Sequence, residues 1–206
     1  MSARAKLTSS INKFGRTVRI LKDAGNITEK HLIVSGFGAR AEKTPFPMES
    51  SYFLWSSEIR AGDICQDMLT EDRTLIASLD YLGVNGSKDG IRVTELKCND
   101  SIILYELVPT SSLDEFGKKN YNPTVRLNDY AGVFHNVRGD SLAPIGEIDK
   151  NQVIIIFSGR KIGSYLPKEG DRLVILSGAK YQIDGVDAHI YPGSFKTLCS
   201  PDQRTE

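Results

Sequence analysis

Residues that could carry out catalysis are few in this sequence. The three histidines, His31, His135 and His189, have no acidic or cysteine neighbour at a spacing that matches a catalytic or metal-binding motif. A hydrolase needs a nucleophile beside a base that an acid orients. The chain contains no G-x-S-x-G, H-E-x-x-H or P-loop pattern. We therefore predict that the protein is not an enzyme.

Three aspartates in the C-terminal part, Asp171, Asp184 and Asp187, could in principle chelate a cation together. Aspartate in a stretch rich in Gly, Ser and Pro more often accepts hydrogen bonds from the backbone of a turn. We expect this second role, and we predict neither a metal site nor a cofactor.

One nominal cofactor motif follows an apolar segment. Gly36, Gly38 and Ala41 fit the G-x-G-x-x-A pattern of dinucleotide-binding folds. Such a site needs a helix that begins at the glycines, so that its N-terminus faces the pyrophosphate. Pro45 and Pro47 fall where this helix would run, and a proline inside a helix costs about 3 kcal/mol. The segment is therefore predicted to be a loop.

Composition narrows the class of protein further. The 206 residues include 26 basic and 26 acidic side chains, and a neutral chain lacks the overall positive charge of proteins that grip nucleic acid. No apolar run approaches the roughly 18 residues of a membrane-spanning helix, and the first residues lack the apolar core of a secretory signal. Cys65, Cys98 and Cys199 have no metal-ligand spacing, so we predict reduced, structural thiols in a cytosolic setting.

The elements that position these residues are predicted to be short antiparallel strands. Apolar and polar residues alternate in short runs that Gly, Pro, Asn and Ser interrupt. The clearest set closes the chain, where residues 173–176, 181–187 and 195–199 read as three successive strands. The fold class is therefore all-β, with two small antiparallel barrel or sandwich domains and long loops.

The predicted domain boundaries follow changes in composition. Residues 1–108 form an N-terminal β domain with a long loop at 22–51, and Ser101 to Leu107 extends its sheet. Residues 109–130 are polar and rich in turn-forming residues, which predicts a linker. Residues 131–206 form a C-terminal β domain.

The two halves show a weak internal repeat. Gly62-Asp63 opens one copy and Gly170-Asp171 opens the other. In our overlay Thr74 to Ala77 matches Lys180 to Ile183, Val93 matches Phe195, and Gly185 is an inserted bulge residue. Duplication is one interpretation, and two unrelated antiparallel sheets are the alternative.

The C-terminal motifs resemble a known family. The motifs are Gly170-Asp171-Arg172-Leu173-Val174, Tyr181-Gln182-Ile183-Asp184, Val186-Asp187, Tyr191-Pro192-Gly193 and Asp202-Gln203-Arg204. Their order is similar to that in head–tail joining proteins of tailed bacteriophages. Ala61-Gly62-Asp63-Ile64 and Glu95 to Tyr105 resemble the earlier part of two-domain neck proteins of the same type. The resemblance covers about residues 60–107 and 150–204.

The resemblance implies a head-closure protein, or stopper. Such a protein assembles in the host cytoplasm and forms a ring, a hexamer or dodecamer, in the virion neck. It contacts the portal or adaptor on one side and tail proteins on the other, and double-stranded DNA passes through its channel. No membrane is involved. Rings need heterologous interfaces, and we expect exposed edge strands to pair between subunits.

In these rings a loop of each subunit reaches the channel. The first candidate is residues 35–47, in which glycines allow bending and two basic side chains could touch phosphate: Ser35, Gly36, Phe37, Gly38, Arg40 and Lys43. The same loop could instead face outward and contact a neighbouring ring. The second candidate is residues 83–90, which include Asn85, Gly86 and Lys88.

Two other functions stay open at this point. A tail or baseplate ring protein would have the same small β domains. An OB-like single-stranded nucleic-acid-binding module would need a basic groove with stacking aromatic residues, and the balanced charge and single Trp55 count against it.

Overall fold

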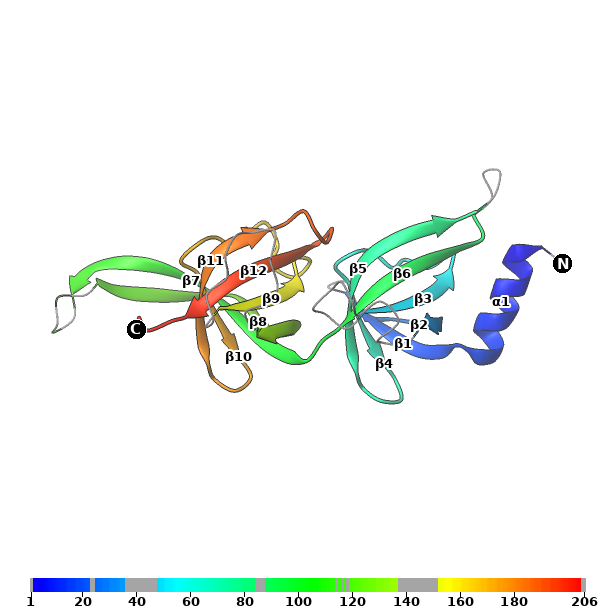
Figure 1. The fold of residues 1–206 in the computed structure, drawn as a ribbon, viewed down its shortest axis with the longest axis horizontal. Helices are drawn as coiled ribbons and strands as arrows, with labels where there is room; N and C mark the ends of the chain where they lie inside the picture. The colour runs from blue at the N-terminus through cyan, green and yellow to red at the C-terminus, as the bar shows by residue number, and fades with distance from the viewer. Residues whose placement is uncertain are drawn as a thin grey trace. The chain divides into compact units, whose positions relative to one another are not determined.

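The fold consists of two closed antiparallel β-barrels of six strands each (Figure 1). This computed structural model describes residues 2–22, 25–35, 48–83, 88–113, 115, 117, 119–136 and 152–204, without the side chains of residues 35, 129–131 and 136. Contacts divide the chain into two compact units, Met1–Cys98 with Tyr191–Ser194 and Asn99–Ile190 with Phe195–Glu206. The prediction of an all-β chain with two small barrels is confirmed.

The first unit begins with the helix α1 (Ala3–Phe14), which Ser2 caps by accepting a hydrogen bond from the Ala5 N–H at 3.2 Å. Leu7 and Ile11 turn toward the barrel, and Ile11 is fully buried. The strands that follow are β1 (Arg16–Leu21), β2 (Ile27–Ser35), β3 (Met48–Leu54), β4 (Ile64–Asp67), β5 (Arg73–Leu82) and β6 (Gly90–Lys97). Their order around the barrel is β1-β2-β3-β6-β5-β4, and β1 pairs with β4 to close it.

The second barrel repeats this topology. Its strands are β7 (Asp100–Leu113), β8 (Lys119–Asn136), β9 (Val153–Ser158), β10 (Arg172–Ile175), β11 (Lys180–Asp187) and β12 (Ser194–Pro201). Their order is β7-β8-β9-β12-β11-β10, and β7 closes the barrel on β10. Strands β7 to β12 therefore correspond, in order, to strands β1 to β6.

The Gly-Asp corners are equivalent to the level of single hydrogen bonds. Gly62 N–H donates to the Ile76 carbonyl at 2.8 Å, and Ile76 N–H donates to the Asp63 carbonyl at 2.9 Å. Gly170, Asp171 and Ile183 repeat this exchange at 2.9 and 2.8 Å. Both glycines have positive φ, +85° and +89°, which residues with a side chain adopt only at a cost.

These bonds also correct the predicted alignment. Ile76, not Ala77, corresponds to Ile183, and the register of β5 and β11 shifts directly after these two residues. The bulge in β11 therefore lies between Ile183 and Gly185, at Asp184. Similarly, Cys98 N–H and Asp202 N–H donate to the equivalent carbonyls of Arg73 and Lys180. In this register Ile91, not Val93, corresponds to Phe195. Both strands carry a bulge at the same place, so β11 has no inserted residue relative to β5, whereas the sequence overlay treated Gly185 as one.

The predicted linker is wrong. Most of residues 109–130 belong to β7 and β8, which form a long hairpin. Ser101 to Leu107 also belongs to β7 in the second barrel, so the boundary between the units lies at Cys98–Asn99 and not at 108. Similarly, the predicted loop at 22–51 contains β2 and the start of β3. Polar and proline-rich composition here marks an exposed ribbon rather than a connection.

The positive φ of the repeated corner gives a stability prediction. Gly170→Ala should lower the free energy of unfolding by about 1–2 kcal/mol, because a Cβ disfavours the left-handed backbone. Gly185→Ala is the matched control in the same barrel, since its φ is ordinary and an added Cβ would meet nothing within 4 Å. Chemical denaturation measures both, and an equal loss in the two variants would contradict the role of the corner.

Candidate functional site

Only part of the predicted channel loops lies in the described residues. Ser35 ends β2 opposite Ser50, whereas Gly36, Phe37, Gly38, Arg40 and Lys43 fall outside the described part of the chain. In the second candidate loop Asn85 and Gly86 also fall outside it, and Lys88 is exposed just before β6. The G-x-G-x-x-A segment joins β2 to β3, an antiparallel pair, whereas a dinucleotide fold requires parallel strands there.

The motif residues of β11 and the following turn have structural roles. Tyr181 packs its ring against Phe134 at 5.7 Å, and Asp184 accepts hydrogen bonds from Gln152 and Ser200 at 3.2 and 2.9 Å. Asp187 accepts hydrogen bonds from the N–H groups of His189 and Ile190 at 2.8 and 3.3 Å, as predicted for a turn.

The segment Tyr191, Pro192 and Gly193 makes the turn into β12. Ser194 N–H donates to the Tyr191 carbonyl at 3.0 Å, and Gly193 has a φ of 74°. Among the described residues, no group of His, Cys, Asp and Glu is placed to hold a metal ion.

The largest departure from a plain barrel is the β7–β8 hairpin. Beyond the pairing of β7 with β10, which ends at Tyr105, the two strands pair only with each other in the described ladders. The ribbon runs from Glu106, opposite Thr124, to Leu113, opposite Lys119, and it projects from its own barrel (Figure 1). A two-stranded ribbon is marginally stable by itself in water, so it needs either a clamp or a partner.

The ribbon exposes apolar side chains and lacks a backbone N–H at one position on each strand. Val108, Leu113 and Val125 are 47%, 60% and 50% exposed. Pro109 on β7 and Pro123 on β8 have no N–H, so neither edge can donate a hydrogen bond to an added strand at these points. The ribbon therefore offers side chains, rather than a continuous backbone edge, to a partner.

One clamp at the root of the hairpin is an ion-pair network. Glu106 accepts hydrogen bonds from Arg126 Nη2 at 2.5 Å and from Lys168 Nζ at 2.8 Å, and these bonds lower the pKa of Glu106. The Arg126 guanidinium lies 4.7 Å from the centre of the Tyr165 ring. Tyr165 in turn donates its hydroxyl to Asp171 Oδ2 at 2.6 Å. The repeated Gly-Asp corner is thereby connected to β8.

A second clamp is formed by the C-terminal segment. Asp202 accepts hydrogen bonds from Arg172 Nε at 2.7 Å and from Arg204 Nη2 at 2.8 Å, and the side chains of Asp202 and Arg172 are 0% and 1% exposed. Burial alone would raise the pKa of Asp202, but the two guanidinium groups outweigh it and hold the pKa far below its usual range. Arg204 also donates to the Gly170 carbonyl at 2.6 Å.

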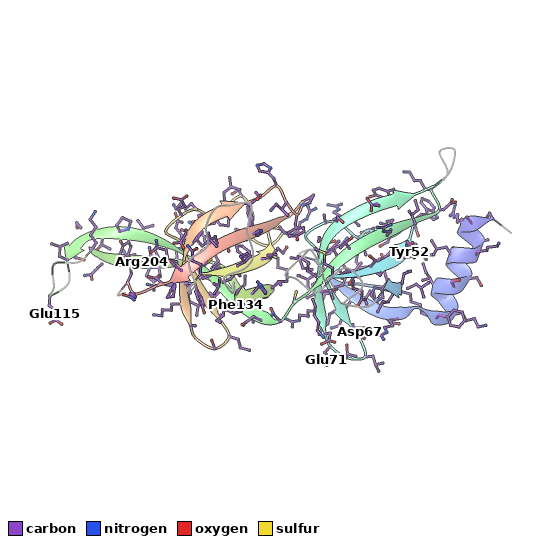
Figure 2. The ribbon with its side chains drawn as sticks, viewed as in Figure 1. Tyr52, Asp67, Glu71, Glu115, Phe134 and Arg204 are labelled. Atoms are coloured by element: carbon purple, nitrogen blue, oxygen red, sulfur yellow. The ribbon has the colours of Figure 1, made fainter. Side chains whose placement is uncertain are left out.

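Arg204 carries this clamp to the hairpin itself. Its guanidinium lies 5.3 Å from the centre of the Tyr121 ring on β8. Figure 2 shows Arg204 beside the root of the hairpin and Glu115 at its tip. Gly170, Asp171, Asp202 and Arg204, which carry much of the sequence resemblance, are thus connected to the hairpin and hold its root.

Sequence reasoning missed the hairpin, although one signal was present. Tyr121, Pro123, Val125 and Leu127 alternate with polar residues at a period of two, which is typical of a strand. The two prolines and Gly117 made the same segment resemble a linker. The ion pairs of Glu106, Arg126 and Lys168 join positions 20 or more residues apart, and no local pattern predicts them.

The first barrel has a different special feature, a buried polar cluster. Glu95 is 0% exposed and accepts hydrogen bonds from Ser51 Oγ, from Thr74 Oγ1 at 2.5 Å and, across 3.3 Å, from His31 Nδ1. Burial alone would raise the pKa of Glu95, but these partners outweigh it and lower the pKa. Glu49 lies directly opposite Glu95 in the β3–β6 ladder. In the second barrel, Cys199 and Tyr181 occupy the positions of Glu95 and Thr74.

The three cysteines do not form disulfides, in agreement with the expected free thiols. Burial raises the pKa of Cys98 and of Cys199 to about 12 and that of Cys65 also well above its usual value. Their thiols are therefore protonated near neutral pH and are poor nucleophiles.

Comparisons with known proteins add little. No family model matches the sequence, and no curated protein matches it. Among solved structures, a P2(1) crystal structure of MrkH from K. pneumonia is 11% identical, and an apo structure of MrkH is 10% identical. Each comparison covers 98% of this chain and 84% of MrkH, with a TM-score of 0.19. A TM-score this low supports no conclusion about fold or function. Within the described residues, no helix is long and apolar enough to cross a membrane.

The buried carboxylate pair predicts a pH-dependent stability. Burial and the adjacent Glu95 charge raise the pKa of Glu49 from 4.5 to about 7, so the native state binds this proton more tightly than the unfolded state. The resulting stabilisation is complete below about pH 4.5 and is lost as the pH rises through about 7. Glu49→Gln should remove this loss, which makes the variant more stable than wild type at pH 8 by roughly 1–3 kcal/mol.

Thermal and chemical denaturation between about pH 5 and 8, a range that spans the raised pKa of Glu49, measure this effect. Glu58→Gln, a change of the same size at a side chain that is 71% exposed, is the control. An unchanged pH dependence in Glu49→Gln would show that Glu49 does not bind a proton more tightly in the native state.

The second clamp predicts a coupling between the C-terminal segment and the hairpin. Asp202→Asn leaves the buried Arg172 without a carboxylate, and loss of one partner of a buried ion pair costs about 3–5 kcal/mol. Hydrogen exchange should also accelerate at Asn120 to Asn122 in the hairpin. Glu106→Gln, whose cationic partners are 39% and 58% exposed, should cost less stability. Faster global unfolding with unchanged relative protection of the hairpin would contradict the coupling.

Proposed function

We propose that this chain is a structural protein of a tailed-phage neck, where copies of it form a ring between the portal or adaptor and the tail. The observation that supports this best is the projecting hairpin, because residues of the phage-like motifs hold its root. In this proposal the ring closes the DNA channel after packaging and offers the surface to which the tail attaches.

The hairpin supports an assembly role for a physical reason. Val108, Leu113 and Val125 expose apolar surface on a ribbon that has no barrel strand beside it. Covering such surface is favourable by about 25 cal/mol per Å², and a neighbouring subunit can supply the cover. A ring uses heterologous contacts, in which an outgrowth of one subunit meets a different face of the next.

The mode of assembly differs from the expected pairing of edge strands. Both barrels are closed, and the described ladders leave no barrel strand with a free edge. The prolines at 109 and 123 further disfavour strand addition to the hairpin. Subunits in the proposed ring therefore meet through side chains of the hairpin and the turns. Residues 35–47 remain the proposed channel segment, with 83–90 as the second candidate.

The structure bears differently on the two alternative functions, a tail or baseplate ring and an OB-like module. A ring in the tail or baseplate would use the hairpin in the same way and needs an experiment to separate it. The OB-like alternative does not fit, because an OB-fold has five strands and each barrel here has six.

Removal of the hairpin tests the assembly role in vitro. Replacing residues 108–122 by Asn-Gly connects Leu107 to Pro123 through a two-residue turn. These two residues lie opposite each other in the β7–β8 ladder. The variant should keep a folded second barrel but lose the ring, which native mass spectrometry or light scattering detects. A triple change to serine at Val108, Leu113 and Val125 should weaken the ring without shortening the chain. A wild-type chain that stays monomeric at all concentrations would contradict the proposal.

The position in the particle is tested in the phage. Particles made without this protein should be DNA-filled heads that lack tails and leak DNA, and the hairpin-deleted chain should not rescue them. Heads that retain DNA but carry defective tails would favour the tail or baseplate alternative. Normal tailed particles would exclude both ring functions.

A further inference from the structure

The balanced charge of the chain hides a strong segregation. Residues 1–22 contain six basic side chains and no acidic one, which leaves 20 basic against 26 acidic in the rest of the chain. The six are Arg4, Lys6, Lys13, Arg16, Arg19 and Lys22. Arg16 and Lys22 pair with Asp67 and Glu58 at 3.6 and 3.7 Å. The cations of α1 have no such partner among the described ion pairs.

Helix α1 presents two of these cations in line. Leu7 and Ile11 face the barrel, and the helical period of 3.6 residues puts Lys6 and Lys13 on the opposite side, about 10 Å apart along the axis. Both lysines are exposed. Arg4 lies over the Trp55 ring at 4.5 Å, and Lys30 from β2 donates to the Asn12 carbonyl at 3.3 Å at the other end of the helix. The patch is therefore basic along its whole length.

The exposed residues between the lysines, Ser9 and Asn12, are short and polar. A shallow hollow of about 570 Å³ along the helix is lined, among the described residues, by Ser2, Arg4, Ala5, Thr8, Ser9 and Asn12. Hydroxyl and amide side chains of this kind, together with lysine and arginine, make most protein contacts to nucleic-acid phosphates. Short side chains also let a phosphate backbone approach the helix closely.

The charge of the first turn of α1 also favours binding of an anion. Acidic residues favour the first turn of a helix because they interact well with the helix dipole, yet α1 has none there. It carries Arg4 and Lys6 instead, which repel the positive end of the dipole. An anion bound alongside would relieve this repulsion. By itself this feature is minor, and it adds to the basic patch.

The chemistry of the face separates phosphate from other anionic partners. A helix that lies on a membrane needs large apolar residues on its free face, and here that face carries Lys6, Ser9, Asn12 and Lys13. A protein interface of useful affinity centres on buried aromatic or apolar anchors. The exposed Phe14 lies at the end of the helix with Lys13 stacked 5.0 Å from its ring, so it does not form such a centre. Single-stranded nucleic acid would also need free stacking rings.

We propose that α1 is a binding site for the phosphate backbone of duplex DNA, with Lys6 and Lys13 as the phosphate-contacting cations and the hydroxyl and amide groups between them as hydrogen-bond donors. This inference deepens the proposed function, since it names residues that would touch the genome. It does not depend on ring formation, because the binding site lies within one chain.

Fluorescence anisotropy of a labelled random-sequence duplex with the purified full chain tests the site. Wild type should bind at low salt and weaken steeply between about 50 and 200 mM salt. Lys6→Glu with Lys13→Glu should weaken binding at low salt by tenfold or more and reduce the slope of log K against log salt by about two. Lys119→Glu with Lys180→Glu, the same charge change at exposed lysines of β8 and β11, should keep the slope.

The single Trp55, which lies under Arg4, gives a second readout. Its emission should change when DNA binds wild type and should not change in the Lys6/Lys13 variant. Circular dichroism of both variants checks that α1 stays folded.

Several outcomes would overturn the inference. No binding by wild type at low salt, or an equal loss in the two double variants, would exclude α1 as the site. Equal affinity for anionic vesicles or for polyglutamate would show a general anion surface and not a DNA site. Monomeric chains that bind DNA through Lys6 and Lys13 would support this inference while contradicting the proposed ring, so the two failures are distinguishable.

Discussion

The structure depends on the closure of two hydrogen-bonded ladders. The antiparallel pairs β1–β4 and β7–β10 join the first and fourth strand of each barrel, and every barrel strand then has two neighbours. Backbone groups that an open sheet would leave unpaired are thereby satisfied within the barrel. The barrels themselves offer no template for strand addition. Recognition must then rest on what is added to them, namely the helix, the turns and the long hairpin.

The additions differ between the two barrels although the scaffold is the same. The first barrel carries α1 and a buried set of polar side chains around Glu95. In the second barrel Cys199 fills the corresponding position, and the counterpart of the short β1–β2 connection is the projecting hairpin. Copies of one topology have thus acquired separate surfaces. In the functions proposed above, the hairpin contacts neighbouring subunits and the helix contacts the genome.

The sequence predicts the fold class and the repeated corner because both rest on local chemistry. A short apolar run marks β10, alternation marks β11, and a glycine before aspartate at 62 and 170 marks a backbone with positive φ. The assignment of strands to barrels is a different matter. Ser101 to Leu107 reads correctly as a strand, but no local pattern shows that it pairs with β10 rather than with β6. The overlay of β5 on β11 is one residue out before the bulge, because a bulge residue looks like any other in sequence.

The candidate site was harder to predict than the fold. Asp202 and Arg204 stand out as a motif, but their contact with Arg172 and Tyr121 joins residues that are distant in the chain. Pro109 and Pro123 suggest a linker because proline is rare in sheets, and only the open edges of a two-stranded ribbon explain their presence in β7 and β8. Helix α1 is missed for a different reason. Its apolar side is only Leu7 and Ile11 wide, which gives a weak period.

A duplicated scaffold also carries a hazard during folding, because halves of like topology can exchange partners. Strands of one barrel could pair with strands of the other barrel, either within one chain or between two newly made chains. The buried charge of Glu95 opposes this exchange, since β6 placed in the second barrel would put a carboxylate at the buried position of Cys199, without the imidazole of His31. The polar cluster around Glu95 therefore favours pairing of β6 with the strands of its own barrel.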